Sequence, residues 1–115
     1  LIPSNYFAVE ALQQLATLAN AVQKTTLANN ALALAKEVET ALVKLNNELK
    51  AKGYNRFAYE TDGFGNYHFM DDANVPSLLA LPYLTRMPAS NVQYVVTRQW
   101  VLSNNNPYFF KGSAG

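Results

Sequence analysis

The chain has 115 residues, half of them hydrophobic, and its formal net charge of +1 is typical of one small globular domain with its own core. The nine Lys and Arg side chains are scattered without a basic face or run, which argues against a nucleic acid or an anionic membrane surface as the partner. The chain has no cysteine for disulfides or thiolate metal sites, and no apolar run reaches the ~18 residues that span a bilayer.

Two long helices are predicted in the first half of the chain. Ser4 or Asn5 can cap a first helix that runs to about Val22, because apolar residues recur there at three- and four-residue steps. Residues 25–26 interrupt this pattern and begin a second, longer helix, which ends near Gly53, a residue suited to a helix C-terminus. Mixed charges indicate that one face of the second helix meets water. We expect the two helices to form an antiparallel hairpin.

A short β-hairpin is predicted after the second helix. Residues 57–60 and 66–70 alternate in polarity and are rich in aromatic side chains, which is typical of strands. The sequence Asp-Gly-Phe-Gly at 62–65 lies between them and is typical of a turn.

Two further helices are predicted in the second half. The third begins near Asn74, where Asp72 or Asn74 can cap it. Its residues are almost wholly apolar, so we expect it to be buried on all sides until Pro82 ends or kinks it. A capping box at residues 90–93, Ser-x-x-Gln, opens a fourth, amphipathic helix. The remainder, residues 103–115, is expected to be loop, so the fold class is all-α with a short β-hairpin.

The candidate functional residues are acids in the middle of the chain. Four of its eight carboxylates fall within residues 57–84, a stretch without Lys or Arg. Acids among aromatic groups without nearby cations tend to have raised pKa values, and such acids are common at functional sites. We expect at least one to accept hydrogen bonds from ligand hydroxyl groups. With a neighbouring amide, the candidates for substrate binding are Asp71, Asp72, Asn74, Glu60 and Asp62.

Structural alternatives exist for each of these side chains. Adjacent Asp71 and Asp72 point in different directions, so one can cap the third helix while the other forms a salt bridge. Asp62 before a glycine is ordinary turn chemistry, and the single histidine, His68, is expected to be structural. Because the acids lack metal-ligand spacing, we expect no metal and no other cofactor. Nearby aromatic residues suit either a core or a platform for a sugar; they are Tyr59, Phe64, Tyr67 and Phe69.

These residues belong to motifs that resemble those of a known family. The chain is similar to glycoside hydrolase family 125, the metal-independent exo-acting α-1,6-mannosidases, also known as the meiotically up-regulated gene 157 type. The resemblance covers nearly the whole chain, and its 70–79 block is specific. In chain order the motifs are Glu-Thr-Asp-Gly-Phe-Gly (60–65), Met-Asp-Asp-Ala-Asn-Val-Pro-Ser-Leu-Leu (70–79), Thr-Arg (97–98), Val-Leu-Ser (101–103) and Asn-Pro-Tyr-Phe-Phe (106–110).

The resemblance implies that residues 1–115 are a central fragment of a single (α/α)6 barrel domain, without an internal boundary. It also implies an inverting enzyme, in which two carboxyl groups lie ~6.5–9.5 Å apart with a water between them. The family's general acid is expected before Leu1 and its general base after Gly115, so the catalytic residues of this chain are unknown. Asp71, Asp72 and Asn74 are then assigned to sugar binding and support of the site.

The expected function is the removal of terminal mannose from a mannose-containing oligosaccharide or N-glycan, with the fragment alone inactive. An alternative is a non-catalytic glycan-binding or scaffolding relative that keeps the helical shell but lacks the acid and base. A hydrolase on the same barrel with another substrate is a third possibility. Localisation is left open: the secretory pathway or the cell exterior for a eukaryotic protein, the cytoplasm for a bacterial one.

Overall fold

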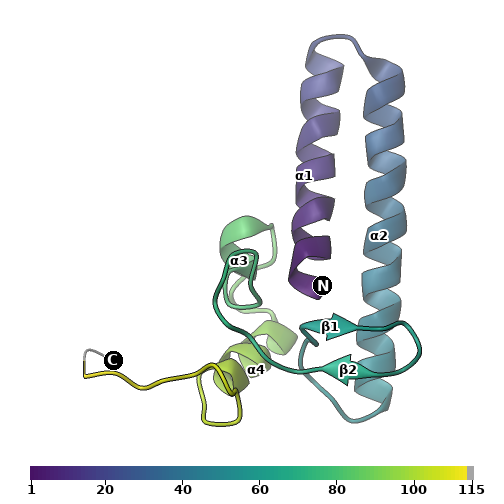
Figure 1. Cartoon of the computed structure of the whole chain (residues 1–115). Helices are drawn as coiled ribbons and strands as arrows, with labels where there is room; N and C mark the ends of the chain where they lie inside the picture. Colours follow the sequence, from purple (N-terminus) through teal and green to yellow (C-terminus); the bar gives the residue numbers. More distant parts are fainter. Residues whose placement is uncertain (114–115) are drawn as a thin grey trace.

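The computed structural model describes residues 1–113, and its largest feature is an antiparallel pair of long helices (Figure 1). Helix α1 spans Ile2–Ala21 and helix α2 spans Thr25–Ala51. The predicted helical hairpin is therefore confirmed. Gly53 follows α2 with a positive φ of 88°, a conformation that glycine adopts without a steric penalty.

The predicted cap of the first helix is wrong, because α1 begins before Ser4 and Asn5 rather than at them. Pro3 lies in the first turn, where the missing N–H removes no helical hydrogen bond. The Asn5 side chain instead donates to the Leu1 carbonyl oxygen at 2.6 Å. The beginning of α1 lies against the β-hairpin. There the Ile2 N–H donates to the Tyr59 carbonyl oxygen at 2.7 Å.

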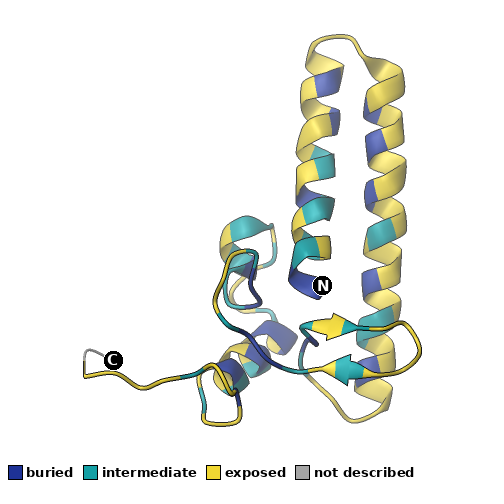
Figure 2. Cartoon of the chain, in the orientation of Figure 1, coloured by how far each residue is buried: buried dark blue, intermediate teal, exposed yellow. Residues whose placement is uncertain are grey.

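The contact between α1 and α2 is made mainly of alanine. Four alanines, two from each helix, form one buried cluster with Leu12 packed against it. Several larger apolar residues are exposed on both helices, and most of the two helices is coloured as exposed in Figure 2, although Leu42 and Leu49 of α2 are buried. A buried methyl group contributes much less hydrophobic free energy than a buried leucine side chain, so the alanine contact stabilises the helix pair less than a leucine contact would. The exposed leucines are Leu15, Leu18, Leu27, Leu32 and Leu34.

The β-hairpin forms as predicted but with shorter strands. Strand β1 is Glu60–Thr61 and strand β2 is Tyr67–His68, and the two pair antiparallel. Tyr59 extends the pairing, because its N–H donates to the His68 carbonyl oxygen at 2.9 Å. The Tyr59 carbonyl oxygen is the group that accepts the hydrogen bond from Ile2. The hairpin is thus fixed to the beginning of α1.

The predicted helix from Asn74 is not present. Residues 74–80 form turns and bends, and helix α3 is a single turn at Leu81–Leu84. The reason is local, because the Asp72 side chain accepts a hydrogen bond from the Asn74 N–H and closes an Asx turn. Ala73 within this turn has a positive φ of 60°, which is incompatible with a right-handed helix.

The predictions for Pro82 and for the burial of the third helix are also wrong. Pro82 lies in the first turn of α3, where proline is tolerated, rather than ending it. The helix is not buried on all sides, because Tyr83 is 96% exposed. Val75, which was expected within this helix, is 66% exposed and lies in the turns before it. Only part of this apolar stretch therefore reaches the core.

Helix α4 spans Val92–Val101, and its cap differs from the predicted one by one residue. Asn91, rather than Ser90, is the capping residue, and its Oδ1 accepts a hydrogen bond from the Tyr94 N–H at 3.0 Å. Serine and asparagine cap helices about equally well, so the local backbone, not the residue type, decides between these two neighbours. The rest of the chain, as far as residue 113, is loop and turn, as predicted.

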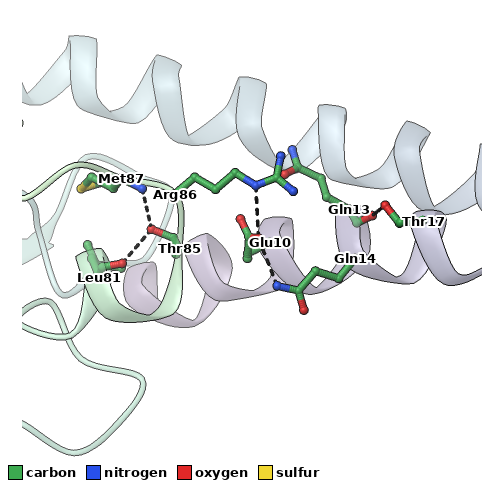
Figure 3. Close-up of polar contacts among 8 residues, drawn as sticks. All are labelled: Glu10, Gln13, Gln14, Thr17, Leu81, Thr85, Arg86 and Met87. Atoms are coloured by element: carbon green, nitrogen blue, oxygen red, sulfur yellow. Dashed lines mark hydrogen bonds and ion pairs between the residues drawn. The ribbon is translucent and has the colours of Figure 1, made fainter.

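The second half of the chain packs around a small core near the start of α1. Its buried members come from all parts of that half: Phe57, Leu78, Leu81 and Tyr94. Helix α3 also contacts α1, and an ion pair strengthens the contact, with Arg86 Nε 3.3 Å from Glu10 Oε1 (Figure 3). Within residues 1–113, no helix has both the length and the apolar character needed to cross a membrane.

Candidate functional site

Asp71 is the buried anchor of the loop that connects the β-hairpin to α3. Asp71 is 2% exposed. Its carboxylate accepts hydrogen bonds from the N–H groups of Leu78 at 3.2 Å and Leu79 at 3.1 Å. Burial raises the pKa of the Asp71 carboxyl, and these two hydrogen bonds partly oppose that rise. Asp71 therefore holds the loop in shape from the inside.

Asn106 fixes the backbone of the same loop. Its Oδ1 accepts from the Asp71 N–H at 3.2 Å, and its Nδ2 donates to the Asp71 carbonyl oxygen at 2.7 Å. The same Nδ2 donates to the Val101 carbonyl oxygen at 3.0 Å, at the end of α4. Because Asn106 is 3% exposed, water does not replace these bonds readily. The amide side chain thus joins the end of α4 to the acid-bearing loop.

Asp72 points in a different direction from Asp71, as predicted from their adjacency. Its two carboxylate oxygens accept hydrogen bonds from Asn74, one from the backbone N–H at 3.0 Å and one from the side-chain Nδ2 at 2.8 Å. These bonds, the side-chain one first, lower the pKa of the Asp72 carboxyl. Asp72 is therefore a charged acceptor near neutral pH. Each oxygen has a second lone pair, so the pair can still accept from a ligand.

The other two candidate acids lie on the β-hairpin and have different surroundings. Glu60 Oε1 lies 2.9 Å from His68 Nδ1 across the two strands, and both side chains are about half exposed. Asp62 closes the turn, where it accepts from the side chain and N–H of Asn66 and from the N–H of Phe64. The Asn66 side chain is the main cause of a lowered pKa for the Asp62 carboxyl. Asp62 therefore has a clear role in shaping the turn.

Three of the candidate acids act together on one tyrosine. The pKa of the Tyr59 hydroxyl is raised, first by burial and then by the negative charges of Asp72, Asp71 and Glu60. Asp62 is not among the groups that affect it. Asp62, in contrast, lies at the turn of the hairpin, where it bonds Phe64 and Asn66.

The remaining aromatic residues of the hairpin have other environments. Phe69 lies in an aromatic group around Arg56, with its ring centroid 4.4 Å from the guanidinium carbon. The Tyr67 ring faces Lys52 at 4.7 Å, and Phe64 is exposed at the turn. Phe69 therefore belongs to the packed part of the molecule, whereas Tyr59 combines a packed ring with a position beside the acids.

A mostly apolar hollow of about 490 Å³ lies beside the Asp72–Asn74 turn. Its lining comes from that turn and from α3 and α4, and includes Ala73, Val75, Tyr83 and Tyr94. Apolar surface next to a few polar groups is the usual composition of a small-molecule site. Within residues 1–113, His, Asp and Glu side chains do not gather in threes that could hold a metal ion.

Sequence reasoning missed the roles of Asn106 and Tyr59. Asn106 appeared in the sequence only as the start of the Asn-Pro-Tyr-Phe-Phe motif in a predicted loop. The Asn-Pro pair is a turn signal, but it does not reveal that the amide bonds a backbone 35 residues away. Tyr59 was one of four aromatic residues without a distinguishing pattern. Its position beside the acids depends on how the hairpin folds back towards α1.

The comparisons with known proteins agree on one family. The family model described as metal-independent α-mannosidase (GH125) matches residues 1–115. The meiotically up-regulated gene 157 protein of Schizosaccharomyces pombe is 39% identical over 112 residues, which are 96% of this chain. A solved Streptococcus pneumoniae structure, from work on metal-independent α-mannosidases, is a non-productive complex with α-1,6-mannobiose. It matches all of this chain at 35% identity with a TM-score of 0.75.

The matches cover only part of these larger proteins. The chain spans 22% of the S. pombe protein and 28% of the S. pneumoniae chain. The resemblance inferred from the sequence motifs is confirmed, since the family model matches every residue of the chain. The chain belongs to glycoside hydrolase family 125, the metal-independent α-mannosidases.

Proposed function

We propose that the intact protein, meaning the polypeptide that carries this chain with its flanking sequence, is an exo-acting α-1,6-mannosidase that inverts the anomeric centre. Family membership supports glycosidase activity, and the similar S. pneumoniae structure holds α-1,6-mannobiose. The observation that carries the proposal is the charged Asp72 carboxylate, whose lowered pKa is due to its hydrogen bonds with the side chain and N–H of Asn74. Carboxylates that accept from several hydroxyl groups are well suited to binding a sugar.

In this proposal the chain supplies sugar-binding groups, while the proton-transferring pair lies in flanking sequence. The start of α1 supports this division, because Ile2 is hydrogen-bonded to Tyr59, the residue before Glu60. A general acid shortly before Leu1 would therefore enter the site at this end of the helix. Inversion requires a second carboxylate across the sugar with a water between them. We place that group after residue 115.

Each candidate residue has a different part in the proposed site. Asp72, with Asn74, accepts hydrogen bonds from sugar hydroxyl groups, and these bonds accelerate the reaction if they tighten in the transition state. Asp71 supports the loop from within through Leu78 and Leu79. Glu60 lies at the edge of the site, paired with His68, and Asp62 preserves the hairpin turn.

We further propose that residues 1–115 are one segment of a larger (α/α)6 barrel domain. The low coverage of both relatives supports this, as do the exposed leucines of α1 and α2. Exposed apolar patches of this kind are normally covered by protein. In a barrel, helices from flanking sequence would cover them and so stabilise the hairpin.

A disaccharide assay tests the proposed function. The intact protein is incubated with α-1,6-, α-1,3- and α-1,2-linked mannobiose, and released mannose is followed with the anomeric signal by NMR. We expect hydrolysis of the α-1,6 linkage, with β-mannose as the first product. Binding of mannobiose without release of mannose would instead favour a non-catalytic glycan-binding relative. If the protein cleaves only another linkage, the proposed substrate is wrong, whereas the proposed reaction, hydrolysis of a glycoside, still holds.

Chelation is expected to leave this activity unchanged. The acids of residues 1–113 do not form a ligand set for a divalent ion, and the family description is metal-independent. The hydrolysis rate in an excess of EDTA should equal the rate without it. Loss of activity that calcium or zinc restores would mean that the roles of Asp71 and Asp72 have been misassigned.

The isolated segment is expected to be inactive and poorly packed. Residues 1–115 contain neither partner of the proposed catalytic pair, and their exposed leucines would remain uncovered. The purified segment should release no mannose from α-1,6-mannobiose and should bind a dye specific for exposed apolar surface. Hydrolysis by the isolated segment would overturn the location given to the catalytic pair.

A further inference from the structure

Part of the hollow beside the Asp72–Asn74 turn is fixed by hydrogen bonds. Tyr94 of α4 belongs to its lining, and the Tyr94 hydroxyl group donates to the Leu79 carbonyl oxygen at 2.9 Å. Leu79 lines the same hollow, and its N–H donates to the Asp71 carboxylate at 3.1 Å. These bonds tie the lining to the buried part of the molecule. The hollow of about 490 Å³ therefore has a formed shape, within the usual size range of small-molecule sites.

Other residues of the lining are apolar and open to solvent. Tyr83 of α3 is 96% exposed, and Val75 is 66% exposed. Ala73 is also exposed and lines the same hollow, although it lies between Asp72 and Asn74 in the sequence. The apolar surface is therefore continuous with the turn whose carboxylate and amide are the proposed sugar-binding groups.

Apolar surface next to a charged acceptor suits an amphipathic ligand better than an apolar helix. A helix that covered this hollow would also remove the neighbouring Asp72 carboxylate from water, and burying a charge without new partners is costly. A pyranose ring has apolar C–H faces, whereas the hydroxyl groups at its edge can donate to a carboxylate. A tyrosine ring offers a flat apolar surface to such a face. The hollow thus matches the chemistry of a sugar ring.

We propose that Tyr83 is a specificity-determining residue that binds the second sugar ring of the substrate. When the terminal mannose lies at Asp72, the next mannose occupies the hollow with a C–H face against the Tyr83 ring. This inference rests on the proposed function, since it adds a residue to the same site. α-1,6-Mannobiose has two rings, and only one of them can lie next to Asp72. Tyr83 thereby favours a disaccharide or longer glycan over free mannose.

The test replaces Tyr83 in the intact protein and compares the binding of one sugar ring with the binding of two. Tyr83→Ala removes the aromatic ring, whereas Tyr83→Phe keeps it. The matched control is Phe64→Ala, because Phe64 is 91% exposed at the hairpin turn and lies outside the lining of the hollow. Dissociation constants are measured by NMR titration for mannose and for α-1,6-mannobiose with a sulfur atom in its linkage, which resists hydrolysis. Melting temperatures are measured alongside.

Tyr83→Ala should bind the sulfur-linked mannobiose about 3- to 10-fold more weakly than the wild type, the range expected for one aromatic contact. Its affinity for mannose should stay unchanged, because the terminal sugar does not reach the Tyr83 ring. Tyr83→Phe and Phe64→Ala should match the wild type for both ligands. All three variants should melt near the wild-type temperature.

Several results would overturn the inference and leave the proposed function intact, provided that the wild type still releases mannose. Equal losses for mannose and mannobiose would show that Tyr83 does not distinguish a second ring. Unchanged mannobiose affinity in Tyr83→Ala would show that the ring does not contact the sugar. Failure of Tyr83→Ala to fold would place the ring in the packing between helices. A wild-type protein that binds neither sugar and releases no mannose would overturn both proposals.

Discussion

Asn106→Ala is expected to lower the free energy of unfolding of the intact protein by roughly 3–4 kcal/mol. The variant removes three hydrogen bonds made in a buried site, two to the backbone of Asp71 and one to the Val101 carbonyl oxygen. Each buried group left without a partner costs about 1–3 kcal/mol. The loop that carries the acids then loses its connection to α4, so the melting temperature should fall steeply.

Two further variants separate this effect from a general sensitivity of the loop. Asn104 is exposed two residues earlier, and Asn104→Ala should change the unfolding free energy by no more than about 0.5 kcal/mol. Asn106→Asp keeps the size of the side chain, but an ionised carboxylate cannot donate to the Asp71 and Val101 carbonyl oxygens. It should therefore be at least as destabilising near neutral pH. Near wild-type melting temperatures for both Asn106 variants would contradict the role assigned to this residue.

Asp72→Asn is expected to reduce kcat/KM of the intact protein on α-1,6-mannobiose by about 10- to 100-fold. The change replaces a charged acceptor, whose pKa is lowered by Asn74, with a neutral amide of the same size. Hydrogen bonds to charged groups contribute about 1.5–3 kcal/mol, which corresponds to this loss in rate. The melting temperature should change little, because an asparagine oxygen can still accept from the Asn74 N–H.

Comparison with neighbouring variants shows whether the effect is specific. Glu39→Gln removes an exposed carboxylate of α2 and should leave kcat/KM unchanged. Asp71→Asn should act first on stability, because Asp71 holds two backbone N–H groups in a buried position. Asn74→Ala removes the partner of Asp72 and should lower kcat/KM less than Asp72→Asn. If Asp71→Asn, Asp72→Asn and Asn74→Ala differ only in melting temperature, the cluster is structural.

The long helices could be predicted from the sequence because their signals are local and repeated. Apolar residues recur at helical spacing in both, and residues 25–26 and Gly53 supply clear boundaries. The β-hairpin was predictable from the Asp-Gly-Phe-Gly turn between two aromatic segments. The orientation of the leucines was not, because alanines form the contact between the two helices.

The third helix was mispredicted because a side chain competed with the helical backbone. The apolar run after Asn74 resembles a helix, yet Asp72 and Asp71 bind its N–H groups and produce turns instead. A cap chosen by pattern also failed at Ser90, where the neighbouring Asn91 was available. Such choices between adjacent polar residues depend on the local backbone and are not resolved by spacing.

Asp71 and Asp72 lie on one loop, whereas Glu60 and Asp62 lie on the β-hairpin, and the sequence alone does not reveal their separate roles. Asp71 and Asp72 are identical in type and adjacent, so only the fold shows that the first is buried and the second bonds Asn74. Asn106 and Tyr59 act through contacts distant in sequence, which a single sequence does not encode as a pattern. The assignment of Asp72 and Asn74 to a sugar site stays a prediction.

The most direct test of the sugar site is a crystal structure of the intact protein with α-1,6-mannobiose bound. We predict that mannose hydroxyl groups lie within hydrogen-bonding distance, about 2.5–3.2 Å, of the Asp72 carboxylate. Mannobiose bound in a pocket that excludes residues 59–74 would contradict the account, whatever the activity of the enzyme.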